Sequence, residues 1–307
     1  MQNHNCIVVL GATASGKTRL ACDLAYVLDA EIISLDSRQV YKGLDIGTGK
    51  DLEAYTVQGK EIPYHLIDVF EPEQQFYLHD FIRELKLSFE QVLEKKKIPL
   101  LCGGTGLYLD ALRKDFSFTQ IPEDHKLRQE LNQLSKEELL VQLNAMPESS
   151  SRHVDRNSQK RIIRGIEVAR YLSKNQVEPD FPEDKYKPLY LGIRIDTYEN
   201  RNNIRERLIQ RLQSGMVDEA EGLLKNGVSH ERLQELGLEY KYLSYYLQNK
   251  ITKTELTEQL YTAICQYAKR QMTWFRKMEK EEVKIQWLEA PVCNADLIAQ
   301  LKAQLLF

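Results

Sequence analysis

Eight residues near the N-terminus, Gly11-Ala-Thr-Ala-Ser-Gly-Lys-Thr18, have the residue types and spacing of a phosphate-binding loop. An apolar run at residues 6–10 precedes them and a helix-like run at residues 19–28 follows, so the glycines lie between a strand and a helix. In that position the backbone N–H groups of residues 12–17 converge on a phosphate, and the helix N-terminus adds partial positive charge. Lys17 supplies a full charge, and the Thr18 hydroxyl can take a magnesium coordination position. The predicted phosphate-binding residues are therefore Gly11, Ala12, Thr13, Ala14, Ser15, Gly16, Lys17 and Thr18, which indicate a phosphorylated substrate without specifying it.

A carboxylate follows the next apolar run, in the segment Ser34-Leu-Asp-Ser-Arg-Gln-Val-Tyr41. The carboxyl ends of parallel strands form the ligand crevice of an open α/β sheet, so Asp36 is expected to face the site that Lys17 marks. Asp36 is either a general base or acceptor for a nucleophile, or a carboxylate that caps a turn or holds magnesium-bound water; the motif favours neither. The following Lys42-Gly-Leu-Asp-Ile-Gly-Thr-Gly49 suits a flexible loop that contacts substrate.

A second glycine segment, Gly103-Gly-Thr-Gly-Leu-Tyr108, follows another apolar run. Its glycines permit close approach of the backbone to a ligand, and Thr105 presents a hydroxyl there, although a simple turn explains the spacing slightly better. Residues 99–102 contain no acid, whereas many ATPases end this strand with a magnesium-binding aspartate. This absence counts against a motor or switch ATPase.

Basic residues gather between residues 152 and 170, where six bases face two acids. Arg156, Lys160 and Arg164 are spaced i, i+4, i+8, so a helix would align them on one side, opposite the apolar Ile162 and Ile166. A solvated face and a surface for a phosphate backbone explain this segment equally well. The chain as a whole has a formal charge of −3, so a polyanionic partner requires such a local basic surface.

Two further segments combine bases with a helical pattern. Arg207 and Arg211 lie one turn apart, and arginine forks suit the oxygen pairs of a diphosphate, although surface ion pairs are the common alternative. Residues 266–276 interleave aromatic residues with Lys269 and Arg270, a mixture that can stack on and neutralise single-stranded nucleic acid. Tyr267 and Trp274 fit equally well in an apolar core.

The elements that position these groups follow from hydrophobic patterning. Strand-like runs at residues 7–10, 31–35, 64–69, 98–102 and 189–195 predict a parallel sheet, because helix-like or loop segments separate the first four. Charged helical patterns replace strands between residues 116 and 187. We therefore predict an α/β core made of residues 1–115 and 188–307, with C-terminal helices, and a helical insertion over residues 116–187. The five cysteines are scattered singly, which is typical of reduced, buried residues. The N-terminus lacks a signal-peptide pattern and no apolar window has the length of a bilayer span.

Taken in order, these segments resemble the tRNA dimethylallyltransferase family, also called tRNA isopentenyltransferases, from Gly11 to Arg276. The motifs that carry the resemblance are the phosphate loop, Asp36-Ser-Arg-Gln-Val-Tyr-Lys-Gly-Leu-Asp-Ile-Gly-Thr48, His65-Leu-Ile-Asp68, Gly103-Gly-Thr-Gly-Leu-Tyr108, Arg161-Ile-Ile-Arg-Gly-Ile-Glu167 and Ala268-Lys-Arg-Gln-Met-Thr-Trp274. The resemblance implies a P-loop NTPase-like fold. It also implies transfer of a dimethylallyl group from its diphosphate to the exocyclic N6 amine of the adenosine 3′-adjacent to the anticodon in tRNA.

By that resemblance, Asp36 receives or orients the amine proton, while Thr105 and Arg207 bind the diphosphate of the donor. The phosphate loop holds the same leaving group through Mg²⁺, with Thr18 as the protein ligand. The insertion and the C-terminal helices grip the anticodon stem-loop. The residues expected to bind the tRNA substrate are Ser37, Arg38, Gln39, Arg156, Gln159, Lys160, Arg161, Arg164, Lys269 and Arg270. A cytoplasmic monomer with no membrane contact is expected.

Three positions depart from the family pattern. Ala12 replaces a usual proline, Asn203 replaces a frequent second arginine on the helix of Arg207, and Gly237-Leu-Glu-Tyr240 replaces a Gly-Tyr-basic-Glu run. Three alternatives remain: a P-loop kinase that phosphorylates a small molecule, an adenylate isopentenyltransferase that acts on free AMP, and an RNA-binding module whose nucleotide loop is only a switch. The basic segments argue against a mononucleotide acceptor, which needs neither of them.

Overall fold

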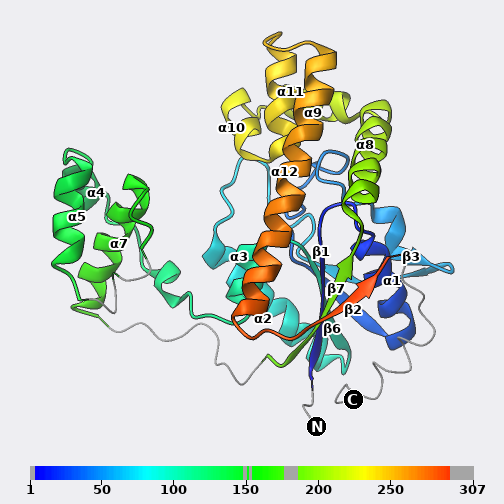
Figure 1. Cartoon of the computed structure of the whole chain (residues 1–307), viewed down its shortest axis with the longest axis horizontal. Coiled ribbons are helices and arrows are strands. Elements are labelled where there is room, and N and C mark those ends of the chain that lie inside the picture. Colours follow the sequence, from blue (N-terminus) through cyan, green and yellow to red (C-terminus); the bar gives the residue numbers. More distant parts are fainter. Residues whose placement is uncertain (1–3, 148–150, 152–153, 176–185, 291–307) are drawn as a thin grey trace. The chain divides into compact units, whose positions relative to one another are not determined.

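The computed structural model describes residues 4–147, 151, 154–175 and 186–290 of the chain. It divides into two compact units, one made of residues 1–112 and 184–307 and the other of residues 113–183. The first is called the α/β unit below and the second the insertion unit (Figure 1). The predicted limits of the insertion were residues 116 and 187.

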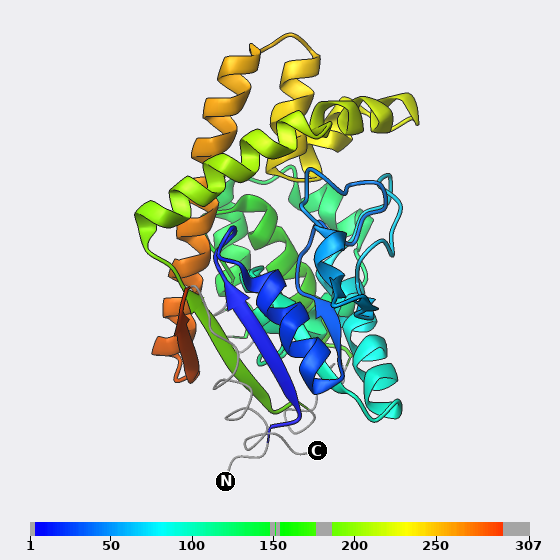
Figure 2. The ribbon, with the colours of Figure 1, turned by 90° about the vertical axis from the view of Figure 1, so that its right-hand side faces the viewer.

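A six-stranded parallel sheet is the centre of the α/β unit, with the strand order β5-β2-β6-β1-β7-β8. The register places Val9 of β1 opposite Cys102 of β6 on one side and Leu191 of β7 on the other. Figure 2 shows β1, β7 and the C-terminal β8 side by side. The strands are β1 (Cys6–Gly11), β2 (Ala30–Ser34), β5 (Tyr64–His65), β6 (Ile98–Gly103), β7 (Pro188–Arg194) and β8 (Ile285–Glu289).

The inner strands consist mainly of apolar residues on both faces, as expected where helices cover both sides of a parallel sheet, with Glu31 and Ser34 of β2 as buried polar exceptions. All residues of β1, β2 and β6 are buried. Helix α1 (Lys17–Leu28) packs Leu20 and Leu24 against Ile7 and Val9. Helix α2 (Leu78–Glu94) contacts β2 and β6 from the opposite face (Figure 1). The α/β class that the sequence predicts is confirmed.

Two strand predictions need correction. The run at residues 64–69 forms only the two-residue β5, because Leu66 and Asp68 adopt positive φ angles of 62° and 56°, which end the extended backbone. The edge strand β8 was not predicted, since its residues are only partly buried and its apolar and polar residues alternate only weakly. A small hairpin, β3 (Thr56–Val57) with β4 (Lys60–Glu61), follows the 3₁₀ helix η1 (Leu52–Tyr55).

The C-terminal helices pack above the carboxyl edge of the sheet around a second core (Figure 1). This core joins Leu208, Met216, Tyr240 and Leu260 from these helices to Leu44 of the loop after β2. The helices are α8 (Thr197–Gln213), α9 (Met216–Lys225), α10 (His230–Glu235), α11 (Leu238–Leu247) and α12 (Lys253–Lys280), and α3 (Gly106–Ala111) follows β6. The 28-residue α12 contacts α8, α11 and α3 and so links the second core to the sheet.

The insertion unit is helical over the residues described. It contains the 3₁₀ helix η2 (Ser117–Gln120) and helices α4 (His125–Leu131), α5 (Lys136–Asn144) and α7 (Gln159–Leu172). Leu139, Leu143, Ile162 and Ile166 form its core. Arg156 precedes α7, so the predicted helical alignment holds only for Lys160 and Arg164.

Cys6, Cys22 and Cys102 are buried free thiols and Cys265 is a partly buried one, as the single spacing predicts; Cys293 lies outside the described residues. Among the residues described, none of the helices combines the length and apolar character that a bilayer span requires.

Candidate active site

The predicted chemical groups meet at the carboxyl edge of the sheet. Strands β2, β6 and β1 are adjacent, and their C-terminal ends lead directly into Asp36, Thr105 and the phosphate loop. Parallel pairing brings these three segments together although residues 18 and 105 are far apart in the sequence. The sheet therefore explains why these motifs form one site.

The phosphate loop has the backbone of an anion-binding turn. Ala14 and Gly16 adopt φ angles of 60° and 87°, and Gly16 is the N-cap of α1. Lys17 begins α1, and its Nζ atom lies 3.5 Å from the carbonyl oxygen of Ala12. A left-handed residue at position 16 lets the chain enter the helix with its N–H groups directed to one point. The loop can hold a phosphate at the helix N-terminus.

Two C-terminal helices fix this loop from outside. The Asn200 side chain on α8 donates to the carbonyl oxygen of Thr13 at 2.9 Å. Gln271 on α12 accepts from the Thr13 backbone N–H at 2.8 Å and donates to the carbonyl oxygen of Gly104 at 3.0 Å. Because the Thr13 N–H already donates to Gln271, fewer N–H groups of residues 12–17 can bind a phosphate than the sequence predicts. Gln271 was not singled out in the sequence, although it lies within the Ala268–Trp274 motif and is a polar residue on the apolar stripe of α12.

Electrostatics at Lys17 favour an anionic ligand. Burial is the largest influence and lowers the pKa of Lys17 below its ordinary value, while the carboxylates of Asp36 and Asp51 act in the opposite direction. Burial also raises the pKa of the neighbouring Cys102 thiol to about 11, so that this group is neutral near pH 7. A desolvated ammonium group gains from a bound anion because the anion replaces the lost water.

A cavity of about 510 Å³ lies between the sheet edge and the C-terminal helices. It brings together Asp36, Thr105 and Arg207, the three residues predicted to be catalytic. Its other polar and aromatic lining includes Ser37, Arg38, Arg211, Glu239, Tyr267, Arg270, Gln271 and Trp274. Lys269 is exposed on α12, and neither Lys269 nor Gln39 lines this cavity.

The two predicted catalytic side chains at the sheet edge differ in their bonding. One oxygen of Asp36 accepts the backbone N–H of Arg38 at 2.8 Å, so the carboxylate caps a turn and also lines the cavity. The Thr105 hydroxyl is buried beside the Tyr267 side chain, with which it interacts, and no hydrogen bond of good geometry satisfies it within the described part of the chain. A buried hydroxyl whose hydrogen bonding is incomplete is unfavourable, and a ligand oxygen that accepts from Thr105 would relieve this cost. Trp274 packs against Gly106, where any side chain would overlap its ring.

Arg207 lies between this cavity and a second one of about 250 Å³ beside the phosphate loop. The second cavity is lined by Lys17, Thr18 and Asp51 as well as Arg207. Arg207 pairs with the Asp51 carboxylate and donates to the carbonyl oxygen of Gly49 at 3.4 Å. One guanidinium group therefore borders both the predicted leaving-group site and the space in front of Asp36.

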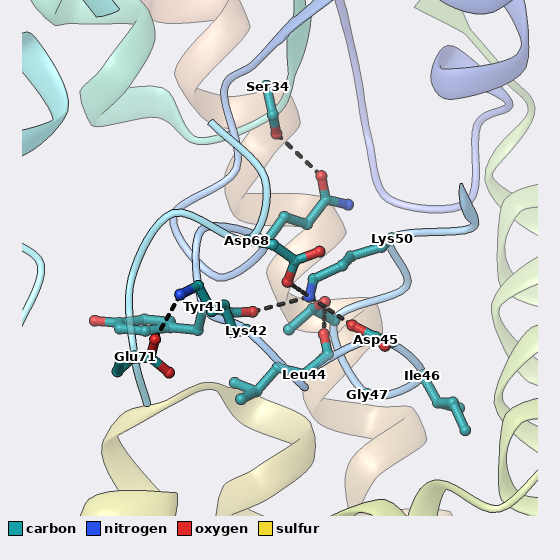
Figure 3. A network of polar contacts seen from close by, with 12 residues as sticks. Ser34, Tyr41, Lys42, Leu44, Asp45, Ile46, Gly47, Lys50, Asp68 and Glu71 are labelled. Carbon is teal, nitrogen blue, oxygen red and sulfur yellow. Dashed lines mark hydrogen bonds and ion pairs between the residues drawn. The ribbon is translucent and has the colours of Figure 1, made fainter. Parts of the chain in front are cut away.

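The loop over residues 41–50 is held by a buried lysine that the sequence did not single out. Lys50 is fully buried, and its Nζ atom donates to the carbonyl oxygen of Tyr41 at 2.8 Å and to Asp45 at 2.5 Å, and pairs with Asp68. Figure 3 shows the Lys50 side chain directed between these acceptors. Gln39 extends the network, because it accepts from Ser34 at 3.0 Å and donates to the Gly49 carbonyl at 3.1 Å.

A carboxylate on α9 holds the same loop from the other side. Glu219 accepts the backbone N–H groups of Asp45, Ile46 and Gly47 at 2.7–2.9 Å, and the Tyr240 hydroxyl at 2.6 Å. A side chain at Gly47 would overlap the Tyr240 ring. The glycine-rich segment that suggested a flexible loop is therefore tightly bonded, and its far end positions Gly49 beside Arg207.

The predicted tRNA-binding residues of the insertion unit have different surroundings. Arg164 pairs with Glu167 and donates to the carbonyl oxygen of Ile121 at 2.7 Å, so it supports the unit internally. Arg161 pairs with Asp155 at 2.7 Å, and Gln159 donates to the Leu134 carbonyl at 3.3 Å. Arg156 and Lys160 are exposed.

Comparison with known proteins places these features in a family. The family model described as IPP transferase matches residues 39–278, and the one described as isopentenyl transferase matches residues 4–68. A tRNA dimethylallyltransferase 2 of Shewanella sediminis is 45% identical over 94% of this chain and 94% of its own length. Another, from Phocaeicola vulgatus, is 44% identical over 98% of this chain and 97% of its own length. A crystal structure of a tRNA isopentenylpyrophosphate transferase from Bacillus halodurans is similar with a TM-score of 0.70 and 28% identity, over 98% of this chain and 95% of the other. The chain belongs to the IPP transferase family.

Proposed function

We propose that this chain transfers a dimethylallyl group from dimethylallyl diphosphate to the exocyclic N6 amine of the adenosine 3′-adjacent to the anticodon in tRNA. Its relatives carry the name tRNA dimethylallyltransferase. The observation that carries the proposal is the 510 Å³ cavity, in which Asp36 and Thr105 meet Arg207 at the border of the phosphate-loop cavity. The diphosphate thus has Arg207 and the phosphate loop as partners, and the amine has Asp36.

The reaction breaks the bond between the allylic carbon and the diphosphate oxygen and forms a carbon–nitrogen bond. Positive charge develops on the allylic carbon and negative charge on the leaving oxygen, so fixed cations at the latter stabilise the transition state most. Lys17 and Arg207 supply these cations, and the Thr105 hydroxyl donates to an oxygen of the same group. Desolvation strengthens the effect at Lys17, whereas the Arg207 side chain is 29% exposed and is screened more by water.

The acceptor amine is a weak nucleophile, since its lone pair is delocalised into the purine ring. Asp36 orients the amine and accepts its proton, a contribution of about 10²–10⁴-fold in rate. The adenine leaves its stack to enter the cavity, at a cost of a few kcal/mol. Tyr267 and Trp274 line the cavity and offer faces on which the base stacks. Arg270 and Lys269 lie on the same helix, and we expect them to contact the flanking phosphates.

Mg²⁺ fits the residues beside the phosphate loop. Thr18 lines the 250 Å³ cavity next to Lys17, and within the described ranges no three His, Cys, Asp or Glu side chains gather as a metal cluster. The Thr18 hydroxyl would be the protein ligand, and diphosphate oxygens would supply the rest. When bound, the ion neutralises charge on the leaving group. We also propose that the enzyme acts as a monomer and in the cytoplasm, the compartment of a tRNA acceptor.

The test is incubation of the purified protein with dimethylallyl diphosphate and unmodified tRNA, followed by nucleoside mass analysis. A dimethylallyl addition on the adenosine beside the anticodon is expected. Unchanged adenosine mass together with phosphate transfer from ATP to a small alcohol would refute the proposal in favour of a kinase. Parallel incubation with AMP tests the mononucleotide alternative, which predicts a prenylated AMP product without tRNA. Asp36→Asn, which retains the shape of the side chain, is the inactive control.

A further inference from the structure

The helix that carries Arg207 also carries Arg211, whose side chain is largely buried and which the proposed reaction does not use. On the same helix, Asn203 donates to the carbonyl oxygen of Ala14 at 3.4 Å and brings no charge. Arg211 lies one turn after Arg207, on the face of α8 that is directed at the site. Of the four arginines on this helix, Arg207 and Arg211 line the 510 Å³ cavity.

Arg211 borders the reaction cavity and remains incompletely bonded. Its side chain is 14% exposed and lines the 510 Å³ cavity together with Arg207. Its Nη2 atom is buried without a hydrogen-bond partner in the described part of the chain, and its ion pair with Asp51 is 3.7 Å long. A buried guanidinium N–H without an acceptor is unfavourable, so this geometry suits an absent anionic ligand.

The backbone is shaped to admit both guanidinium groups. Gly49 has a φ angle of 61°, and a Cβ atom there would lie 1.4 Å from Arg211 Nη2 and 2.7 Å from Arg207 Nη2. The loop that carries Gly49 is fixed by Gln39 and by the Lys50 network. Glycine at position 49 therefore lets two cations approach the same point, beside the phosphate-loop cavity that Arg207 lines.

Few negative charges balance these two cations. Asp51 contacts both arginines but is about half exposed. Glu239 is partly buried near Arg211, and burial raises the pKa of its carboxyl above the usual range. Burial and the charge of Arg207 both lower the pKa of Arg211. A ligand with several negative oxygens would relieve this repulsion better than one shared carboxylate.

We propose that Arg211 is a second cation of the diphosphate site, where it binds an oxygen of the leaving group beside Arg207 and replaces Asp51 as the partner of both arginines. The identity of the donor rests on the proposed function, whereas the binding of a diphosphate does not.

The test measures binding of inorganic pyrophosphate by calorimetry in the absence of divalent cations. Arg211→Met is expected to weaken binding by about 10- to 100-fold, the range for loss of a charge-assisted hydrogen bond. Arg205→Met is the matched control on the same helix, because Arg205 pairs with Glu258 at 3.0 Å on the exposed surface. Asp51→Asn is expected to tighten binding, since it removes the carboxylate that competes for the arginines. Affinity of Arg211→Met for tRNA is expected to stay within twofold of the unsubstituted chain.

A double variant separates ligand binding from simple charge balance. If Arg211 only neutralises Glu239, then Arg211→Met with Glu239→Gln binds pyrophosphate as well as the unsubstituted protein, and the inference is overturned. Persistent weak binding in the double variant supports it. This variant also leaves no carboxylate without its counterion, so it decides the question if the single variant fails to fold. Absence of prenyl transfer by the unsubstituted protein would refute the proposed function while leaving the pyrophosphate result in force.

Discussion

Lys50→Met tests whether the buried lysine holds the loop that borders Arg207. Methionine has a similar length without charge, so the substitution removes three polar contacts and leaves little space unfilled. The carbonyl of the buried Tyr41 loses its donor, which costs about 1–3 kcal/mol. Breaking a fully buried ion pair costs about 3–5 kcal/mol. The side chains of Asp45 and Asp68 are 55% and 34% exposed, however, and regain water, so solvent reduces the second contribution.

We therefore expect Lys50→Met to lower the free energy of unfolding of the α/β unit by about 2–4 kcal/mol. Tryptophan fluorescence during urea titration measures it, because both tryptophans of the chain, Trp274 and Trp287, lie in this unit. The control is Lys42→Met, a lysine of the same loop that pairs with Glu71 at 2.5 Å. Both partners of that pair are 52% exposed, so its loss costs only about 0–1 kcal/mol.

The comparison has a clear refuting result. If Lys50→Met is no more destabilising than Lys42→Met, the buried network does not hold the loop. Adding Asp68→Asn to Lys50→Met removes a carboxylate that has lost its partner, and about 1 kcal/mol should return. The rate of prenyl transfer should fall with the loosened loop, since Gly49 contacts Arg207.

Three further measurements test the site. Asp36→Asn should slow single-turnover prenyl transfer by about 10²–10⁴-fold while filter binding shows unchanged tRNA affinity; a parallel loss of both would make Asp36 a structural turn residue. Burial lowers the pKa of Lys17 and a bound diphosphate raises it, so pyrophosphate binding should take up protons on the alkaline side of neutrality. Calorimetry in buffers of different ionisation enthalpy measures this proton uptake, and an observed binding enthalpy that is the same in all buffers would contradict the reasoning. Replacing Arg156 and Lys160 with alanine should reduce the slope of log tRNA affinity against log salt by up to about one unit per residue, and an unchanged slope would return them to the solvated surface.

The sequence by itself determined the fold class and the three segments that carry the chemistry. Glycine spacing at Gly11–Thr18 requires particular backbone angles, and continuous apolar runs require a sheet covered on both faces, so both signals are local. Asp36 and Thr105 were predictable because they directly follow buried strands, and parallel strands end at one edge. The family followed from the order of such motifs along the chain.

Only the tertiary structure decided how these segments are held and which cations meet there. Gln271 bonds the phosphate loop from a helix more than 250 residues away, and Lys50 is a hub only because Tyr41, Asp45 and Asp68 converge around it. The sequence pattern around Arg211 fits an arginine of a surface ion pair as well as it fits a diphosphate-binding arginine. Its burial beside Gly49 distinguishes the two, and burial depends on how helices pack across the whole chain. A local pattern specifies which groups are present, whereas desolvation and distance arise from contacts between distant segments.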